Sequence, residues 1–582
     1  MEKITIKING IDTTIPADYT VMKAAEELGL DIPRLCFLKG INETSSCRLC
    51  VVDVKGQNGL KNSCTLAVYD GMEIETDTDE IQNSIVQNLQ LLASNHVFEC
   101  WACEREHNCE LLDLMRRYNV ENIYGESNKF HKKERMINDS SKSIVLDSGK
   151  CILCGRCVTA CEVYTGLNIL AFNERGNGTY VGPALFHNMD DSGCIYCGKC
   201  IQACPVAAIK EKTSVDEVME ALRDKSKIVV VGPAPSVRVA LGEEFGSKIG
   251  ENVEGKMYKS FEVAGFDEIM DIAFTADLTV LEEGTELINR MKSGKNLPLF
   301  TSCSPGWVNY IEQYEPDYLS NLSTAKSPQQ MGGIVAKHHF AYELGYKIED
   351  IVFVSIMPCI AKKHEASRPE MEYQGIRDVD HVLTTREYAR MLKRMKIDFM
   401  NLEDSFPHGR IARYTGAGII FGVSGGVMEA ALRTVSEVLG EEQGAIDFKE
   451  VRGSKDIKEA TYNIMGTEIN VAVVHGGASI KEFFKRMKKY KKEYHFVEFM
   501  GCTGGCINGG GQPIHSAKIQ ETHDIAALRT QSIYEIDSKK KHRESRTNKL
   551  LMRMYKDWLG EPNSELAHDL LHTNYKPRKY YK

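Results

Sequence analysis

The pattern of apolar and polar residues at the start of the chain predicts a small β-rich unit. Ile4 and Ile6 alternate with charged and polar residues, as in a strand with one buried face. Asn9-Gly10 is a dipeptide typical of a tight β-hairpin. Residues 20–28 then indicate a capped helix. We therefore expect residues 1–80 to form the first domain.

The pattern changes twice more along the chain. Residues 81–140 are more helical, and residues 141–212 contain two copies of one short cysteine run. From residue 213 onward, short apolar runs alternate with helical segments, which is typical of an α/β domain. The clearest buried-strand candidates there are residues 228–231, 351–354 and 471–474. We expect one large domain over residues 213–582 that becomes basic and helical after about residue 525.

Composition and charge narrow the class of protein. The chain has 582 residues, of which 42% are hydrophobic and 26% charged, as in an ordinary soluble globular protein with several domains. No apolar run resembles a signal peptide, and none approaches the roughly 20 residues of a membrane helix. The net charge of −9 argues against nucleic acid as a partner. We expect a cytoplasmic protein that binds neither nucleic acid nor a membrane.

Nineteen cysteines are the strongest chemical signal in the sequence. Many of them form tight C-x-x-C runs, which in a large protein of this kind favours metal binding over disulfides. Each cysteine falls into a group with the ligand spacing of an iron–sulfur cluster, and His96 completes the group that has only three thiols. Together they supply 20 ligands, the number that five clusters of four ligands need.

The first group is spaced C-x10-C-x2-C-x13-C and consists of Cys36, Cys47, Cys50 and Cys64. Soft thiolates on one loop, with a fourth from a later strand, can bind a [2Fe–2S] cluster. A structural zinc site is the alternative. The spacing differs from that of plant-type ferredoxins, so this assignment also depends on the family resemblance given below.

The second group is spaced H-x3-C-x2-C-x5-C and consists of His96, Cys100, Cys103 and Cys109. A lone histidine beside an apolar helix is usually a packed or surface residue, but here three cysteines lack a fourth partner. We therefore predict a [4Fe–4S] cluster with His96 as a ligand, whose potential the imidazole should raise. His107, within the same run, is the competing candidate.

The third group is a repeated run, C-x2-C-x2-C-x3-C, of the kind found in bacterial two-cluster ferredoxins. In that fold the fourth cysteine of each run binds the other cluster. We therefore predict two [4Fe–4S] clusters, one held by Cys151, Cys154, Cys157 and Cys204, and the other by Cys194, Cys197, Cys200 and Cys161.

The last four cysteines are far apart in sequence, so only a folded domain could gather them. They occur in the segments Thr301-Ser302-Cys303-Ser304-Pro305-Gly306-Trp307, Met357-Pro358-Cys359-Ile360-Ala361-Lys362 and Glu498-Phe499-Met500-Gly501-Cys502-Thr503-Gly504-Gly505-Cys506. These segments resemble the three signature motifs of the [FeFe]-hydrogenases, and the resemblance to the large clostridial-type monomeric enzymes extends over the whole chain.

The resemblance implies a multidomain α+β fold. Its expected parts are a β-grasp [2Fe–2S] domain (1–80), a small His/Cys cluster domain (81–140), a two-cluster ferredoxin-like domain (141–212) and a large α/β H-cluster domain (213–582). The implied cofactors are one [2Fe–2S] cluster, three accessory [4Fe–4S] clusters and an H-cluster. The H-cluster joins a [4Fe–4S] cubane to a diiron unit that carries CO, CN⁻ and an azadithiolate.

The resemblance also assigns roles around the H-cluster. Cys359, Cys502 and Cys506 match cubane ligands, with Cys506 bridging to the diiron unit. Further residues match the surroundings of the cyanides and of the diiron unit: Lys362, Ala234, Pro235, Ser236, Met357 and Met500. A proton-transfer chain is matched by Glu283, Glu286, Arg290 and Ser323. By themselves, two glutamates at i and i+3 would be an ordinary exposed helix pair, but all four residues match with unbroken spacing.

The first motif departs from the family. Its usual form has two adjacent cysteines before the proline, the first delivering protons and the second binding the cubane, whereas this chain has Cys303-Ser304. In strict register, Cys303 is the proton relay and Ser304 takes the ligand's place. By cysteine count, Cys303 binds the cubane, and Ser304 or Ser302 replaces the relay thiol. The interpretation by cysteine count, with Cys303 as the cubane ligand, is favoured because a thiolate binds iron far better than a hydroxyl.

We therefore expect a ferredoxin-linked [FeFe]-hydrogenase that catalyses reversible H2 oxidation and proton reduction. Its expected partners are ferredoxin or flavodoxin and the hydrogenase maturation proteins, and we expect a monomer. One alternative is a slow-turnover H2 sensor with the same cofactor, although no output module is evident. Another is an electron-transfer iron–sulfur protein without hydrogenase activity, which would have no use for the proton-chain and cyanide-site residues.

Overall fold

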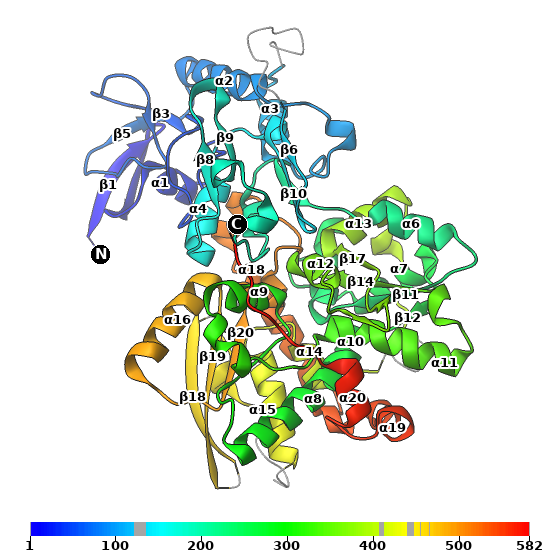
Figure 1. Ribbon diagram of the computed structural model, residues 1–582. Coiled ribbons are helices and arrows are strands. Elements are labelled where there is room, and N and C mark those ends of the chain that lie inside the picture. The colour runs from blue at the N-terminus through cyan, green and yellow to red at the C-terminus, as the bar shows by residue number, and fades with distance from the viewer. Residues whose placement is uncertain are drawn as a thin grey trace.

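The chain folds into a small N-terminal part and a larger C-terminal part that pack against each other (Figure 1). This computed structural model describes residues 2–121, 135–406, 413–438, 447–453, 455–464 and 466–580. No helix among these residues is both long enough and apolar enough to cross a membrane.

The first unit is a five-stranded sheet in the order β2-β1-β5-β3-β4. Its strands are β1 (Lys3–Ile8), β2 (Ile11–Pro16), β3 (Val51–Val54), β4 (Lys61–Asn62) and β5 (Glu73–Glu75). The predicted hairpin is confirmed: β1 and β2 are antiparallel, and Asn9 and Gly10 have φ of 49° and 79°, as a tight hairpin turn requires. The predicted helix is also confirmed as α1 (Val21–Glu27), capped by the side chain of Thr20.

The rest of the small part carries helices and short strands. Two helices, α2 (Asp79–Ser94) and α3 (Glu110–Arg117), confirm the helical character predicted after residue 80. They are followed by a sheet in the order β10-β7-β6, a hairpin β8–β9 and two helices. The bounds are β6 (Ile137–Asn138), β7 (Ile144–Asp147), α4 (Arg156–Thr165), β8 (Leu170–Asn173), β9 (Tyr180–Pro183), α5 (Lys199–Ala203) and β10 (Ile209–Glu211).

The large part is built on two four-stranded sheets. One, in the order β12-β11-β14-β17, is entirely parallel and consists of β12 (Glu268–Ile269), β11 (Ile228–Pro233), β14 (Ile351–Met357) and β17 (His381–Thr384). The other, in the order β13-β20-β19-β18, consists of β13 (Leu299–Phe300), β20 (Phe496–Met500), β19 (Thr467–His475) and the antiparallel edge strand β18 (Ile457–Ile464). The three buried strands predicted from apolar runs are confirmed as β11, β14 and β19.

Helices surround these sheets and the space between them (Figure 1). The longest is α8 (Ile272–Ser293), which packs against α10, α14 and α15. The others are α6 (Val215–Arg223), α7 (Glu254–Ala264), α9 (Pro305–Tyr314), α10 (Pro328–Ile334), α11 (Ala341–Leu344), α12 (Ala361–Ala366), α13 (Thr385–Arg394), α14 (Gly416–Ile420), α15 (Gly426–Val438), α16 (Gly477–Tyr490), α17 (Ala517–Thr522), α18 (Ile525–Lys539), α19 (Lys549–Met554) and α20 (Glu565–Leu571). A small hairpin joins β15 (Glu372–Tyr373) to β16 (Ile376–Arg377).

The two parts meet at a backbone-to-backbone contact. A Cβ added to Gly510 would lie 2.3 Å from the carbonyl oxygen of Cys197 and 2.6 Å from the Cα of Gly198. Only glycine allows main chains to approach this closely. The C-terminal segment returns to the same junction (Figure 1), where the Tyr580 ring lies 4.8 Å from that of Tyr314.

Trp307 anchors α9 to the second sheet. It is fully buried, its ring centre lies 3.9 Å from that of Phe499 on β20, and its indole N–H donates to the carbonyl of Thr301 at 2.8 Å. A large aromatic ring with a satisfied polar atom contributes strongly to a core.

Replacing Trp307 with alanine should destabilise the large part by about 3–5 kcal/mol, because it removes the stack and leaves a cavity. Thermal melts followed by circular dichroism should show a melting temperature lower by roughly 5 °C or more. The matched control is Trp101→Ala, because Trp101 is 80% exposed and its removal should change stability by at most about 0.5 kcal/mol. Equal melting temperatures for the two variants would refute this role of Trp307.

Candidate metal centre

The first thiol group lies at one end of the N-terminal sheet. Cys36, Cys47, Cys50 and Cys64 are all buried, and the sulfur atoms of Cys50 and Cys64 are 3.2 Å apart. The backbone N–H of Cys47 donates to the sulfur of Cys36 at 3.5 Å. These contacts gather the four thiols in one buried place, as a shared cluster would require.

His96 is oriented as a metal ligand would be. Its Nδ1 lies 3.0 Å from the carbonyl oxygen of Lys150, so Nδ1 carries the proton and Nε2 is left as a donor to metal. Burial lowers the pKa of His96 to about 4, which keeps the ring neutral near pH 7. The competing His107 has a side chain that is 76% exposed and faces Glu106. The geometry therefore favours His96.

The repeated runs are brought together in crossed fashion. A small cavity is lined by Cys151, Cys154, Cys157 and Cys204, so the last cysteine of the second run lies with the first three of the first run. The pKa of Cys200 is raised first by burial and then by the charges of Cys197, Cys194 and Cys161, which places Cys161 with the second run. Both runs enter their helices through a left-handed glycine, Gly155 and Gly198.

The last group forms where strands end. Cys359 follows β14 in the first four-stranded sheet. Cys303 follows β13 and Cys502 follows β20, which are parallel neighbours in the second sheet. The segment Ala234-Pro235-Ser236 follows β11 in the same way. Because the carboxyl ends of parallel strands share one edge of a sheet, residues from distant parts of the chain meet between the two sheets.

Cys359, Cys502 and Cys506 are in close contact. The thiol of Cys359 donates a hydrogen bond to the sulfur of Cys502, which raises the pKa of Cys359 and lowers that of Cys502 to about 7. Burial, and then the charge of Cys502, raises the pKa of Cys506 to about 12. The three motif cysteines therefore share one buried space.

Cys303 and Ser304 have different neighbours. After burial, the charge that raises the pKa of Cys303 most is that of Glu283, ahead of Cys506. Cys303 belongs to a hydrophobic cluster that also contains Met500, and Cys506 packs against this cluster. The Ser304 hydroxyl instead accepts the N–H of Gly501, the residue before Cys502, at 3.0 Å.

Other residues assigned by resemblance also line this space. Lys362 donates to the carbonyl of Cys303 at 3.0 Å and pairs with Glu365 at 3.0 Å. Ser236 is fully buried, and its carbonyl and hydroxyl lie 3.3 and 3.4 Å from the side-chain nitrogen of Gln512. Met357 and Met500 are each 3% exposed and end their strands. Ala234 and Pro235 are buried beside them.

Three residues of the expected proton chain are joined by hydrogen bonds, and the fourth, Glu283, lies close enough to be affected by the charge of Glu286. The Ser323 hydroxyl donates to Glu286 at 2.8 Å, and Arg290 pairs with the other Glu286 oxygen at 2.6 Å. One oxygen of Glu283 is buried without a hydrogen-bond partner among the described residues. Burial, and then the charge of Glu286, raises the pKa of Glu283 to about 8, so this carboxyl group carries a proton near pH 7. The hydrogen bonds run from Ser323 through Glu286 to the half-buried Arg290.

Two residues were missed by the sequence analysis. Glu365 holds Lys362 and also accepts from Ser327 at 2.9 Å. Gln512 reaches Ser236 from the far end of the third motif. The spacing of Lys362 and Glu365 at i and i+3 could have indicated the first pair, but no local signal links Gln512 to Ser236.

The donor sets fit iron–sulfur clusters: thiols predominate at every site, with one neutral imidazole at His96, and soft ligands of this kind select iron–sulfur clusters over hard cations. Several such sites in one chain are typical of an electron-transferring oxidoreductase.

Comparison with known families agrees with this class. The matches are to "Iron only hydrogenase large subunit, C-terminal domain" over residues 227–510, "Iron hydrogenase small subunit" over 523–578, "2Fe-2S iron-sulfur cluster binding domain" over 1–79, "4Fe-4S dicluster domain" over 150–208 and "NADH-ubiquinone oxidoreductase-G iron-sulfur binding region" over 87–123.

Similar proteins match over the whole chain. Iron hydrogenase 1 of Clostridium pasteurianum is 43% identical over 98% of this chain and 100% of its own length. The NADP-reducing hydrogenase subunit HndD of Solidesulfovibrio fructosivorans is 41% identical over 100% of both. A structure of a variant of the apo [FeFe]-hydrogenase HydA1 from Chlamydomonas reinhardtii superposes with a TM-score of 0.57 at 33% identity, covering 63% of this chain and 100% of that one.

The chain belongs to the iron-only, or [FeFe], hydrogenase family. It is a multidomain hydrogenase-type oxidoreductase with a 2Fe-2S domain, a 4Fe-4S dicluster domain and an H-cluster domain.

Replacing His96 with alanine should remove one ligand from the second cluster, so the purified protein should lose about four iron atoms and one set of cluster signals in electron paramagnetic resonance. His107→Ala is the matched control and should change neither. Unaltered iron content in His96→Ala, or a loss in His107→Ala, would contradict the assignment.

Proposed function

We propose that this chain catalyses the reversible oxidation of H2 and passes electrons through its accessory clusters to ferredoxin or flavodoxin in the cytoplasm. One observation carries the proposal: the site that contains Cys359, Cys502 and Cys506 lies next to a candidate proton path. This path extends from Glu283 to Arg290. The H-cluster, when bound, supplies a diiron unit at which H2 is cleaved into a proton and a hydride equivalent.

The residues of the chain have separate tasks in this proposal. Cys359, Cys502 and Cys506 would hold the cubane, and Lys362 and Ser236 would supply hydrogen-bond donors for the cyanides of the diiron unit. Met357 and Met500 exclude water, because both are buried and apolar. The protonated carboxyl of Glu283 exchanges its proton with the site and, through Ser323, with Glu286 and the surface.

For the first motif we propose the roles given by strict register, not by cysteine count. Burial, and then the charge of Glu283 ahead of that of Cys506, raises the pKa of Cys303, as expected for a thiol beside Glu283 at the start of the proposed proton path. Ser304 is hydrogen-bonded beside Cys502, as expected for a residue at the cubane. The interpretation by cysteine count does not account for these different neighbours of Cys303 and Ser304.

The proposal has a second candidate for the electron partner. A relative of equal length is named as a subunit of an NADP-reducing hydrogenase, which favours a second candidate in which this chain works within a complex. The two candidates differ in what the isolated chain can do. Alone, it should reduce ferredoxin with H2 in the first case and need a further subunit in the second.

The test is an anaerobic assay of full-length protein co-expressed with hydrogenase maturation proteins. H2-dependent reduction of methyl viologen and of ferredoxin, and H2 production from the reduced dye, are expected. Protein with complete clusters that does neither would contradict the proposed function and favour an electron-transfer protein. Turnover that is present but very slow in both directions would favour the H2 sensor.

Replacing Glu283 with glutamine should lower turnover by about 10²–10⁴-fold, because the amide cannot exchange a proton. The cluster spectra should not change. The matched control is Glu282→Gln on the same helix, whose carboxylate instead binds Tyr555 and His572 and should affect thermal stability more than turnover. Equal losses of turnover in the two variants would argue against a specific path through Glu283.

Replacing Cys303 with alanine separates the two interpretations of the first motif. If Cys303 is the relay, the variant should keep its full iron content and cubane signal while its turnover falls by about 100-fold. Loss of the cubane together with activity would return the ligand role to Cys303. Cys359→Ala provides the comparison, because it should lose the cubane in either case.

A further inference from the structure

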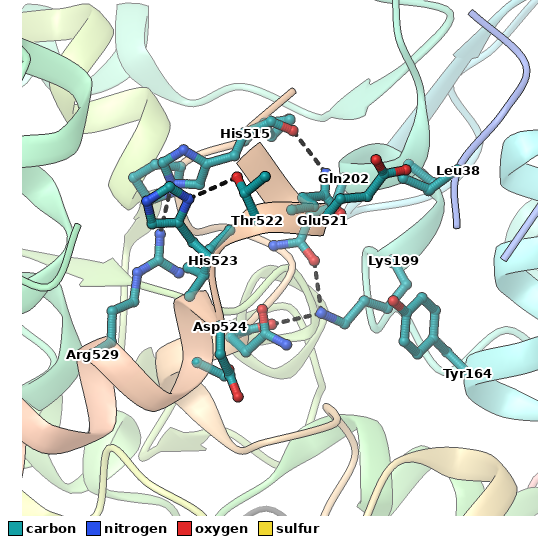
Figure 2. Close-up of a pocket in the computed structure, with 17 residues that line it drawn as sticks. Leu38, Tyr164, Lys199, Gln202, His515, Glu521, Thr522, His523, Asp524 and Arg529 are labelled. Atoms are coloured by element: carbon teal, nitrogen blue, oxygen red, sulfur yellow. Dashed lines mark hydrogen bonds between the residues drawn. The ribbon is translucent and has the colours of Figure 1, made fainter. Parts of the chain in front are cut away.

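Lys199 is a buried lysine at the junction of the two parts, where α5 begins. It is 4% exposed, and its amino group donates to the side-chain oxygen of Gln202 and to the carbonyl of Asn508, each at 2.8 Å (Figure 2). The same amino group lies 5.2 Å from the ring centre of Tyr164. It therefore connects α5, in the small part, to the loop that carries Cys506.

The amino group of Lys199 has no carboxylate partner among the described residues. Its two hydrogen-bond acceptors are an amide and a carbonyl oxygen. Burial lowers the pKa of Lys199, and the charges that oppose this effect are those of Cys502 and Cys197. Burying a cation without a counter-charge is strongly unfavourable. The negative charges that act on Lys199 are those of two sets of thiolates, one that includes Cys502 and one that includes Cys197.

The loops that carry Cys197 and Cys502 touch at this point. The sulfur of Cys502 lies 3.9 Å from the carbonyl oxygen of Cys197, and the main chains touch at Gly198 and Gly510. An electron that passes between the cubane and the accessory clusters crosses this gap. Lys199, which lies between Cys197 and Cys200 in sequence, is the buried cation beside it.

We propose that Lys199 tunes this electron transfer: its charge raises the reduction potentials of the cluster held by Cys161, Cys194, Cys197 and Cys200 and of the neighbouring cubane. The reason is electrostatic. One added electron makes a cluster more negative, and a fixed cation nearby stabilises the reduced form in a medium of low dielectric constant. The proposal rests on the proposed function for the cubane, but its effect on the accessory cluster can be measured without hydrogenase activity.

The test is a redox titration of full-length, cluster-loaded protein followed by electron paramagnetic resonance. Lys199→Gln removes the charge, and Gln202→Glu leaves the lysine in place but sets a carboxylate against its amino group. Both should shift the midpoint potential of the accessory cluster to more negative values. Lys199→Arg keeps the charge, has room in the adjoining cavity of about 430 Å³, and should stay near the wild-type potential.

Two matched controls separate charge from structure. Gln202→Met removes the bond from Gln202 to the Gly509 carbonyl, as Gln202→Glu also does, but adds no charge. Lys481→Gln removes one positive charge from an exposed position near Gly166. Neither should shift the potential.

The outcomes are distinct. A negative shift in Lys199→Gln and Gln202→Glu, absent from Lys199→Arg and the controls, supports the role. If Lys199→Gln fails to assemble clusters, Gln202→Glu decides. Wild-type potentials in the neutralised variants with full iron content would overturn it. The same samples are assayed for H2 turnover, so an inactive wild type with the predicted shifts would refute only the proposed function.

Discussion

The architecture depends on one geometric constraint: four side chains from widely separated segments must meet within the span of a single cluster. The fold meets this constraint by ending β13 and β20 of one sheet, and β14 of the other, at the space between the two sheets, where the residues that follow each strand meet. The strands themselves are almost entirely buried, which fixes their register and therefore the positions of the loops. A shift of one residue in any of them would move a cysteine out of the site.

Buried charges hold these loops in place. Glu498 is fully buried on β20 and accepts the N–H groups of Gly425 and Met428, each at 2.7 Å, at the start of α15. A carboxylate at a helix N-terminus is favourable, and here it fixes the turn that touches Gly505 of the third motif. The Lys362–Glu365 pair does the same for the second motif. Charge networks thus support the site as well as lining it.

The sequence predicts the features that depend on neighbouring residues and misses those that depend on contacts between residues far apart in the chain. The hairpin at Asn9-Gly10, the capped helix after Thr20 and the buried strands are set by neighbouring residues, and the sequence predicts them correctly. The contact of Gln512 with Ser236 and the position of Lys199 near Cys502 depend on tertiary packing, for which no local pattern exists. Cys303 and Ser304 are adjacent in sequence but face different groups, and only the folded strand end distinguishes them.

The central claim is that the site between the two sheets holds an H-cluster that reacts with H2. The most direct measurement is an infrared spectrum of the matured, anaerobically purified protein before and after exposure to H2. The account predicts bands from CO and CN⁻ bound to iron, and a shift of these bands with H2. Absence of the bands in protein with complete iron–sulfur clusters, while the same maturation system activates a control hydrogenase, would contradict it.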